Sequence, residues 1–180
     1  MIRTFDLVFS LLGLFFLSPV LILLWIVGWF DNGSPFFKQS RLGLFQRTFT
    51  LLKFRSMPID TLSVPTHLVN HKNTSHFGLF LRRTKLDEIP QLYNVLMGDM
   101  SLVGPRPCLL KQRKLINERK KRGIFKVKPG ITGLAQISGI TMETPIILAK
   151  TELKMIKKTN LFNYFYYILK TIYLVIKLRS

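Results

Sequence analysis

The chain has 180 residues, of which 48% are hydrophobic and 12% aromatic, and its 27 Lys and Arg against 9 Asp and Glu give a net charge of +18. This apolar content excludes a disordered basic tail, and a single cysteine, Cys108, excludes a disulfide framework or a cysteine-based zinc site. The charge calls for an anionic partner, and a mean hydropathy of +0.24 favours a membrane over a soluble nucleic-acid complex.

The first predicted element is a helix over residues 7–30, a stretch without any charge. At about 1.5 Å per residue it is roughly 36 Å long, which is enough to cross the hydrocarbon core of a bilayer. The stretch is too long for a cleavable signal peptide, and no small-residue cleavage site follows it. Its simplest interpretation is a single tilted transmembrane helix.

A second interpretation is a re-entrant helix that bends at Ser18-Pro19 and returns to the side from which it entered. Pro19 lies at the middle of the stretch, lacks a backbone donor and clashes with the carbonyl of Phe15. The Ser18 hydroxyl can bond a carbonyl freed by such a break. Arg3 and the basic remainder of the chain both favour the cytoplasmic side, and a spanning helix would separate them. Composition alone leaves both interpretations open.

Two short strands are predicted next, over residues 35–43 and 47–57, and the second carries Lys53 and Arg55 among β-branched and aromatic residues. Residues 58–76 follow and are rich in Pro, Ser, Thr and Asn. This segment contains all three histidines of the chain: His67, His71 and His76. No cysteine or acidic cluster joins them, so a solvated, mobile loop is favoured over a metal site.

A helix that ends at Gly98 is predicted after this loop, because apolar residues recur at helical spacing. Thr84 and Asp87 match a capping box at its start. Pro107 is expected to begin a second, basic helix, which Gly123 closes.

Residues 127–139 indicate a glycine-rich loop or short strand, and the chain ends in an aromatic amphipathic helix suited to the membrane interface. The predicted fold class is therefore α/β and membrane-associated. We expect a re-entrant membrane helix over residues 1–31, a small cytoplasmic catalytic domain over 32–160 and an interfacial helix over 161–180.

Asp87 and Glu88 are adjacent acids in a strongly basic chain, and they follow Arg82 and Arg83 at the start of a predicted helix. The helix dipole and free amides there favour ionised carboxylates, so Asp87 is expected to be a charged nucleophile or a ligand of a hard metal. The ordinary alternative is that both acids only cap the helix and pair with the arginines. The positive surroundings point beyond capping, because they attract a phosphate ester and the downstream GPRP turn can add Arg106 as a clamp.

The basic helix after Pro107 also has two interpretations. Basic helices often lie against nucleic-acid phosphates. This one lacks interleaved aromatic residues and a docking fold, and the same chain carries an apolar membrane segment. Contact with anionic lipid headgroups is therefore the favoured interpretation.

The chain contains, in this order, the runs FFKQSRLG, KFRSM, LRRTKLDEIPQLYNVLMGDMSLVGPRP and VKPGITGLAQISG. Together they resemble the bacterial sugar transferases, the monotopic phosphoglycosyl transferases that begin glycoconjugate assembly. The resemblance extends from Phe5 to about Thr171 and is most specific in the central run. No multi-span membrane domain precedes these runs, so the chain resembles the small form of the family.

The resemblance implies transfer of a sugar-1-phosphate from a UDP-sugar to polyprenyl (undecaprenyl) phosphate, with release of UMP and Mg²⁺ as cofactor. It implies a covalent phosphosugar-enzyme intermediate and a location at the cytoplasmic face of the bacterial inner membrane. The product would begin a polysaccharide, an O-antigen or a glycoprotein glycan. Expected partners are the donor, the acceptor and anionic lipids, without nucleic acid, and the oligomeric state is left open.

By the same resemblance, Asp87 is the nucleophile on the β-phosphate and a ligand of Mg²⁺, and Glu88 is the base for the incoming lipid phosphate. The helix-breaking Ser-Pro of the family falls on Ser18-Pro19, which favours the re-entrant interpretation. The residues expected near the nucleotide or the phosphates are Lys53, Arg55, Arg82, Arg83 and Arg106.

The chain departs from the family pattern at Ile140, Thr151, Lys154 and Asn163. These departures leave the sugar, and their effect on activity, undetermined by the sequence. The main alternative function is a catalytically weakened membrane scaffold of the same fold in a glycan-assembly complex. A membrane-tethered nucleic-acid binder is a second alternative and predicts strongly salt-dependent binding without UDP-sugar chemistry.

Overall fold

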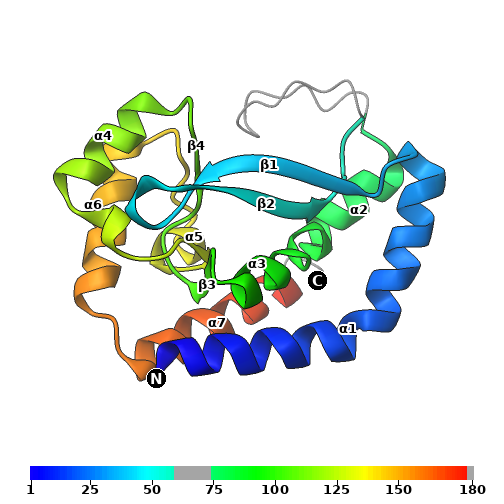
Figure 1. The fold of residues 1–180 in the computed structure, drawn as a ribbon, viewed down its shortest axis with the longest axis horizontal. Coiled ribbons are helices and arrows are strands. Elements are labelled where there is room, and N and C mark those ends of the chain that lie inside the picture. Colours follow the sequence, from blue (N-terminus) through cyan, green and yellow to red (C-terminus); the bar gives the residue numbers. More distant parts are fainter. Residues whose placement is uncertain (59–73, 178–180) are drawn as a thin grey trace.

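A computed structural model describes residues 1–58 and 74–177, and Figure 1 shows a mixed arrangement of helices around small sheets. The helices are α1 (Ile2–Asn32), α2 (His76–Thr84), α3 (Gln91–Met97), α4 (Arg113–Lys121), α5 (Leu134–Ile137), α6 (Pro145–Lys157) and α7 (Leu161–Lys177). Short 3₁₀ turns are η1 (Leu44–Gln46), η4 (Leu86–Glu88) and η5 (Ile124–Lys126). The strands are β1 (Phe36–Leu42), β2 (Thr48–Phe54), β3 (Ser101–Val103), β4 (Cys108–Leu109) and β5 (Gly130–Thr132).

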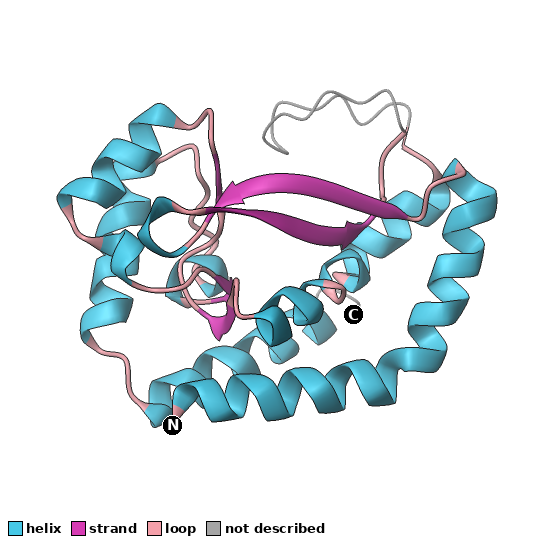
Figure 2. Ribbon diagram, in the orientation of Figure 1, coloured by secondary structure: helices cyan, strands magenta, loops and turns pink. Residues whose placement is uncertain are grey.

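The largest sheet is the long β1–β2 hairpin, whose strands are antiparallel and paired from Phe36↔Phe54 to Leu42↔Thr48. The short strand β4 joins the other edge of β1, and β3 pairs with β5 in a separate parallel ladder (Figure 2). Both strands predicted before residue 58 are confirmed. The α/β class is confirmed at the level of mixed helix and sheet, with helices dominating.

Helix α1 is long and apolar enough to cross a membrane by length and composition. Figure 1 shows that it changes direction along its length, so that one limb runs beside α3 and α7 and the other rises beside α2. Pro19 lies inside the helix, and the Ser18 hydroxyl donates to the carbonyl of Phe15 at 2.7 Å. This is the carbonyl four residues before Pro19, so the predicted compensation for the missing proline donor is confirmed.

Each limb of α1 packs into a different part of the core. Ile2 and Phe5 lie against the cluster formed by Leu51, Val95, Met100, Leu102 and Tyr164. Leu24 packs with Phe54 and Leu81 in a second cluster. The helix is therefore held at both ends by one folded body.

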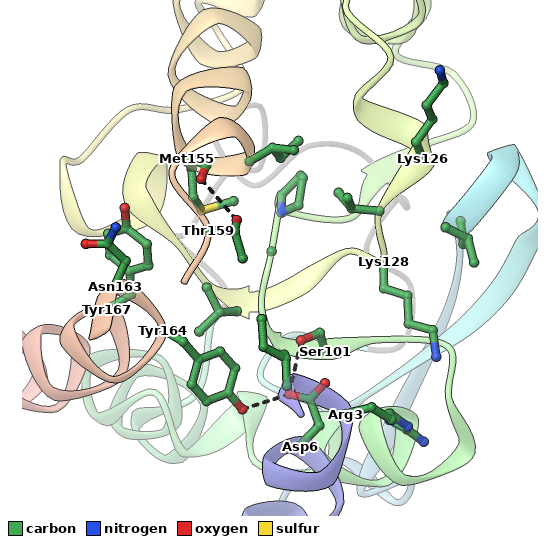
Figure 3. Close-up of a pocket in the computed structure, with 17 residues that line it drawn as sticks. Arg3, Asp6, Ser101, Lys126, Lys128, Met155, Thr159, Asn163, Tyr164 and Tyr167 are labelled. Atoms are coloured by element: carbon green, nitrogen blue, oxygen red, sulfur yellow. Dashed lines mark hydrogen bonds between the residues drawn. The ribbon is translucent and has the colours of Figure 1, made fainter. Parts of the chain in front are cut away.

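Asp6 is the polar anchor of the first limb, at only 2% exposure. Its Oδ1 accepts hydrogen bonds from the Ser101 hydroxyl at 3.0 Å, the Leu102 amide at 2.9 Å and the Tyr164 hydroxyl at 2.8 Å. Burial and this bond to Asp6 raise the pKa of Tyr164. Figure 3 shows the cluster at one wall of a cavity of about 410 Å³, and it joins α1, β3 and α7.

The predicted single helix ending at Gly98 is wrong in its first half. Helix α2 ends at Thr84, Lys85 takes a left-handed conformation (φ 59°), and α3 begins only after Pro90. Thr84 is no cap, since its hydroxyl donates to the carbonyl of Phe80 at 2.7 Å. The cap of α2 is Ser75, whose hydroxyl oxygen accepts from the Gly78 amide at 2.9 Å. A left-handed residue cannot continue a right-handed helix, so Lys85 ends α2, and the 3₁₀ turn Leu86–Glu88 separates it from α3.

The start predicted at Pro107 for the basic helix is also wrong. Cys108 and Leu109 instead pair with β1, and α4 begins at Arg113. Pro107 is a local signal for the start of a helix, but the residues after it form a strand because they pair with β1, which is distant in the sequence. The glycine-rich segment contains the predicted strand, β5, and also the short helix α5, which was not predicted. The C-terminal amphipathic helix is confirmed as α7.

Candidate active site

The acidic pair Asp87–Glu88 lies in the 3₁₀ turn between α2 and α3, where Asp87 is only 8% exposed. Lys53 reaches it from β2, and its Nζ lies 2.7 Å from Glu88 Oε1 and 3.9 Å from Asp87 Oδ2. The hairpin thus brings a cation to Glu88 from 35 residues away in the sequence. The antiparallel register pairs Lys53 with Phe37, so the two side chains lie on the same face of the hairpin.

Arg106 supplies the second cation. It lies in the turn after β3, and its guanidinium Nη2 is 3.7 Å from Glu88 Oε1. The side chain of Arg106 is 47% exposed, whereas that of Glu88 is 20% exposed. The guanidinium is therefore open to an incoming anion while it stays beside the acids. The structure thus places Arg106 beside the acidic pair, as the sequence predicts.

The two acids have opposite pKa shifts. Burial opposes ionisation of Glu88, but Lys53, Arg106 and Lys85 outweigh it and lower its pKa to about 2. Burial raises the pKa of Asp87, and the charge of Glu88 adds to the rise, against the opposing effect of Lys53. Acidification therefore protonates Asp87 before Glu88.

The expected cause of Asp87 ionisation is corrected by this geometry. Asp87 lies in a 3₁₀ turn that follows α2, so it does not lie in the first turn of an α-helix. A helix dipole therefore does not lower its pKa, and the nearby cations are what favour its charge. The purely capping interpretation also fails for Asp87, because its Oδ1 has no hydrogen-bond partner in the described part of the structure.

Of the other residues predicted for the site, Arg82 acts on the acidic pair, whereas Arg83 and Arg55 form no hydrogen bond or ion pair with it in the described part of the chain. Arg82 lies in the last turn of α2, and its charge acts on Asp87. Arg83 is exposed, and its side chain forms no hydrogen bond or ion pair within residues 1–58 and 74–177. The guanidinium of Arg55 donates to the carbonyls of Ser34 and Phe36. A place for Arg55 near the nucleotide or the phosphates stays a prediction.

His67 and His71 lie outside the described residues, and His76 begins α2. Within the described residues, no three His, Cys, Asp or Glu side chains form a cluster that could hold a metal by themselves. Mg²⁺ needs no such cluster, because one or two carboxylates and substrate phosphates commonly complete its shell. Asp87 fits this role, since its buried Oδ1 is unpartnered and Glu88 lies next to it.

Arg41 is a site residue that the sequence analysis missed. Its guanidinium donates to the carbonyl of Pro107 at 3.0 Å, and burial followed by the charge of Arg106 lowers its pKa to about 10. The strand register places it on the same face of the hairpin as Lys53. Two-residue alternation is a usable signal for this position, but only once the register of the hairpin is known.

Comparison with known proteins bears on what this site does. A family model described as bacterial sugar transferase matches residues 1–178. The chain is 40% identical over 161 residues to a UDP-glucose:undecaprenyl-phosphate glucose-1-phosphate transferase of Xanthomonas campestris pv. campestris, covering 85% of this chain and 32% of that protein. It is 42% identical over 149 residues to the Escherichia coli K12 protein of the same name, covering 79% and 32%.

A shorter relative is also similar. The chain is 44% identical over 138 residues to the uncharacterized sugar transferase EpsL of Bacillus subtilis, which covers 76% of this chain and 68% of that protein. The chain thus spans about a third of the length of the Xanthomonas and Escherichia relatives and about two thirds of the Bacillus relative.

Proposed function

Because this chain belongs to the bacterial sugar transferase family, we propose that it transfers a sugar-1-phosphate from a UDP-sugar to undecaprenyl phosphate and releases UMP. The observation that carries the proposal is the acidic pair Asp87–Glu88 with Lys53 and Arg106 around it. Relatives are named for the same reaction with UDP-glucose as donor. The reaction would be the first membrane step in assembling a glycoconjugate.

In the first step, an Asp87 carboxylate oxygen attacks the β-phosphorus of the donor. The bond between this phosphorus and the bridging oxygen breaks, and its electron pair leaves with UMP. The product on the enzyme is an aspartyl-phosphosugar. The unpartnered Oδ1 of Asp87 supports this role, because no protein hydrogen bond within the described residues must be broken to free it.

In the second step, an oxygen of the undecaprenyl phosphate attacks the same phosphorus. The bond to Asp87 breaks, the electron pair returns to its carboxylate, and the sugar leaves on an undecaprenyl diphosphate. A phosphate monoester has a second pKa of about 6 and is mostly dianionic at neutral pH, so this attack needs no strong base.

Glu88 accordingly takes a different role from the base that the family resemblance suggests. A carboxylate whose pKa is about 2 is a weak base at neutral pH. Its contacts with Lys53 and Arg106 instead hold both cations beside the reacting phosphates. Those cations offset the repulsion between a carboxylate and a diphosphate and stabilise the charge that develops on UMP.

Asp87, with Glu88 next to it, would also hold Mg²⁺, which supplies Lewis-acid neutralisation of the diphosphate charge when it is bound. The hard carboxylate oxygens suit this cation.

We further propose that α1 is re-entrant and that the domain lies on the cytoplasmic face of the inner membrane. Arg3 donates to the carbonyls of Val95 and Leu96 at 2.6 and 3.0 Å, so the start of α1 is held by the body that also holds its end. A spanning helix would place those ends about 30 Å apart across the bilayer core. The exposed apolar residues along the two limbs of α1 support insertion into one leaflet.

The proposed reaction is tested with a panel of UDP-sugars and undecaprenyl phosphate, with UMP release and the lipid-linked sugar as readouts. At least one donor is expected to give both products in equal amounts. Binding without any UMP release, across the whole panel, would favour the alternative of a membrane scaffold. The panel also identifies the sugar.

A further inference from the structure

Arg106 reaches the acidic pair from a turn without regular secondary structure, between the short strands β3 and β4. Its side chain is about half exposed, so packing does not fix it, and its ion pair within the described residues is the 3.7 Å contact with Glu88. The position of the Arg106 backbone decides whether the side chain can reach Glu88, so the contacts of that backbone matter for the site.

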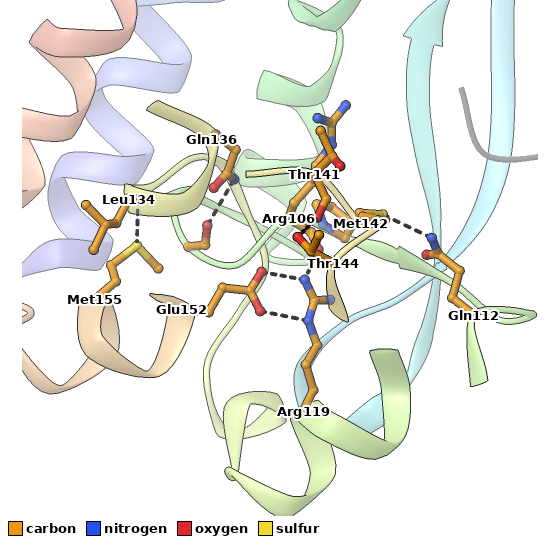
Figure 4. Close-up of polar contacts among 12 residues, drawn as sticks. Arg106, Gln112, Arg119, Leu134, Gln136, Thr141, Met142, Thr144, Glu152 and Met155 are labelled. Carbon is orange, nitrogen blue, oxygen red and sulfur yellow. Dashed lines mark hydrogen bonds and ion pairs between the residues drawn. The ribbon is translucent and has the colours of Figure 1, made fainter. Parts of the chain in front are cut away.

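Arg119 of α4 holds this backbone from the inside of the molecule. One guanidinium nitrogen donates to the carbonyl of Arg106 at 2.8 Å, and the side chain of Arg119 is only 2% exposed. Figure 4 shows its guanidinium between Glu152 and the segment that carries Arg106. Arg119 is thus the one residue of the basic helix segment Arg113–Lys121, within the described residues, that both carries a charge and is buried.

Glu152 of α6 holds Arg119 in turn. Nε of Arg119 donates to Glu152 Oε2 at 2.8 Å and a terminal nitrogen donates to Oε1 at 2.5 Å, with Glu152 fully buried. This paired geometry fixes the plane of the guanidinium and leaves a donor directed at the Arg106 carbonyl. The same turn is held from the other side, where Arg41 donates to the carbonyl of Pro107.

We propose that Arg119 is a positioning residue which, held by Glu152, sets the backbone of Arg106 and so places the Arg106 guanidinium beside Glu88. The inference rests on the proposed transferase function. It assigns the two buried charges a task that neither the basic composition of α4 nor contact with lipid explains. Neither Arg119 nor Glu152 touches the acidic pair, so both act through Arg106.

A purely stabilising role for this pair is the competing explanation, and it makes a different prediction. Removing two charges from water is costly, and replacing a buried ion pair by apolar residues of similar volume is often neutral or stabilising. If the pair served stability alone, such a replacement would leave a folded enzyme with its full activity. If it positions Arg106, the replacement gives a folded enzyme that works poorly.

The experiment replaces both partners, Arg119→Met with Glu152→Leu, in the full chain and compares Tm and kcat/KM for UMP release with the wild type. We expect an unchanged or higher Tm and a loss of up to about 100-fold in kcat/KM, the cost of a small displacement of a charged group in a site. The matched control is Arg122→Met with Glu118→Leu, a partly exposed ion pair at the C-terminal end of α4 that, among the described residues, makes no hydrogen bond or ion pair with Arg106. This control is expected to keep its activity within about two-fold.

A double-mutant cycle with Arg106→Ala gives a readout that a structural role would not move. In the Arg106→Ala background, the paired replacement at 119 and 152 is expected to change kcat/KM by less than about two-fold, since the group it positions is already gone. Equal losses in both backgrounds would overturn the positioning role. Full activity of the paired variant with Arg106 present would overturn it as well.

Arg119→Lys is the second variant, should the paired replacement fail to fold. Lysine keeps a cation beside Glu152, but its Nζ lies one bond short of the Nη2 that donates to both Glu152 and the Arg106 carbonyl, and it has no counterpart of the Nε that completes the fork on Glu152. It is expected to lose activity with Arg106 present and to add no loss in the Arg106→Ala background, whereas equal losses in both would overturn the inference. An inactive wild type would refute the proposed function itself, and an active wild type with an active Arg119→Lys variant would refute only the positioning role.

Discussion

Asp87 and Glu88 are neighbours in the chain, yet their surroundings shift the pKa of each carboxyl in opposite directions. Glu88 contacts Lys53 and Arg106 directly, so its pKa falls to about 2. Asp87 is 3.9 Å from Lys53 and is buried without a partner for Oδ1, so its pKa rises. This division suits one acid to hold cations and the other to react, which the next three predictions test.

Asp87→Asn is expected to reduce UMP release by at least about a thousand-fold, because it removes the attacking carboxylate. Burial raises the pKa of Asp87, so the ionised form costs stability in the fold and the neutral amide should not lower Tm. Brief incubation of the wild type with donor should add one sugar-phosphate mass to the peptide that contains Asp87. Wild-type UMP release by the variant would contradict the proposed nucleophile.

Lys85→Asn is expected to move the acid limb of the pH–rate profile to higher pH. The charge of Lys85 lowers the pKa of Asp87, so its removal raises that pKa, and more alkaline conditions are needed to ionise the nucleophile. Asparagine accepts the left-handed backbone at this position. At pH values well above the limb, the rate should stay within about two-fold of the wild type. Lys120→Asn is the control with the same change in net charge, and an equal shift there would refute the local effect.

Chelation of Mg²⁺ is expected to stop turnover, and added Mg²⁺ should restore it, because a carboxylate and a diphosphate otherwise repel each other. The measurement is UMP release in excess chelator with residual Mg²⁺ quantified. Undiminished turnover without the ion would show that Lys53 and Arg106 alone neutralise the diphosphate.

At the scale of the element, α1 contains a proline that a straight membrane helix would disfavour and a serine that compensates for it. The Ser18 bond to Phe15 satisfies the freed carbonyl, which the proposed insertion into lipid requires. Gly28 packs closely against Pro35, which fixes the second limb of α1 to the start of the hairpin. Helix α1 therefore contains the bend at Ser18-Pro19, an attachment at Arg3 before it and an attachment at Gly28 after it.

The paired change Ser18→Ala with Pro19→Leu is expected to let a fraction of molecules straighten into a spanning helix. A cysteine is placed at the exposed position 4 (Thr4→Cys) in a Cys108→Ala background, which removes the native thiol. An impermeant thiol reagent added to intact cells then reports on which side of the membrane the N-terminus lies. The protein that carries Thr4→Cys with the native Ser18-Pro19 should stay unlabelled. The same protein with the paired change at 18 and 19 should gain label. The control Leu12→Ala with Phe16→Leu changes exposed apolar residues of the same helix without touching the break. If the reagent labels the introduced cysteine in the protein with native Ser18-Pro19, the re-entrant proposal is refuted, and the catalytic assignment is unaffected.

At the scale of the whole molecule, Asp6 joins α1, β3 and α7 through one carboxylate oxygen. Aromatic contacts continue this junction, since the ring of Phe5 lies 5.3 Å from that of Phe165. The amphipathic helix α7 thus contributes to the core while Phe162, Leu169 and Ile176 stay exposed, as the proposed contact with a membrane interface requires.

Asp6→Ala is expected to lower the free energy of unfolding by roughly 2–4 kcal/mol, because it leaves buried donors on Ser101, Leu102 and Tyr164 without an acceptor. The measurement is thermal or denaturant unfolding in a fixed detergent. Asp31→Ala is the matched control, since Asp31 is an acid at the other end of α1 whose hydrogen bonds from Asn32 and Ser75 are solvent-exposed, and its loss should cost less than about 1 kcal/mol. Equal effects of the two changes would contradict the anchoring role of Asp6.

The features that depend only on neighbouring residues could be predicted from the amino-acid sequence. The uncharged run with its Ser-Pro break, the two strands of the hairpin and the amphipathic C-terminal helix all carry periodicity or turn chemistry that a short window contains. The acidic pair also stands out in a chain with a net charge of +18. These features led to the family and to the candidate nucleophile.

The three-dimensional packing selects which charges act together. Lys53 and Arg55 lie two residues apart and look equivalent in the sequence, yet Lys53 pairs with Glu88 from within β2, while Arg55 follows the end of β2 and bonds the carbonyls of Ser34 and Phe36. Arg119 resembles its exposed basic neighbours until α6 brings Glu152 against it. A buried charge is stable only with a partner, and that partner lies tens of residues away. Local patterns therefore located the candidate acidic pair, and long-range packing selected the cations that lie beside it.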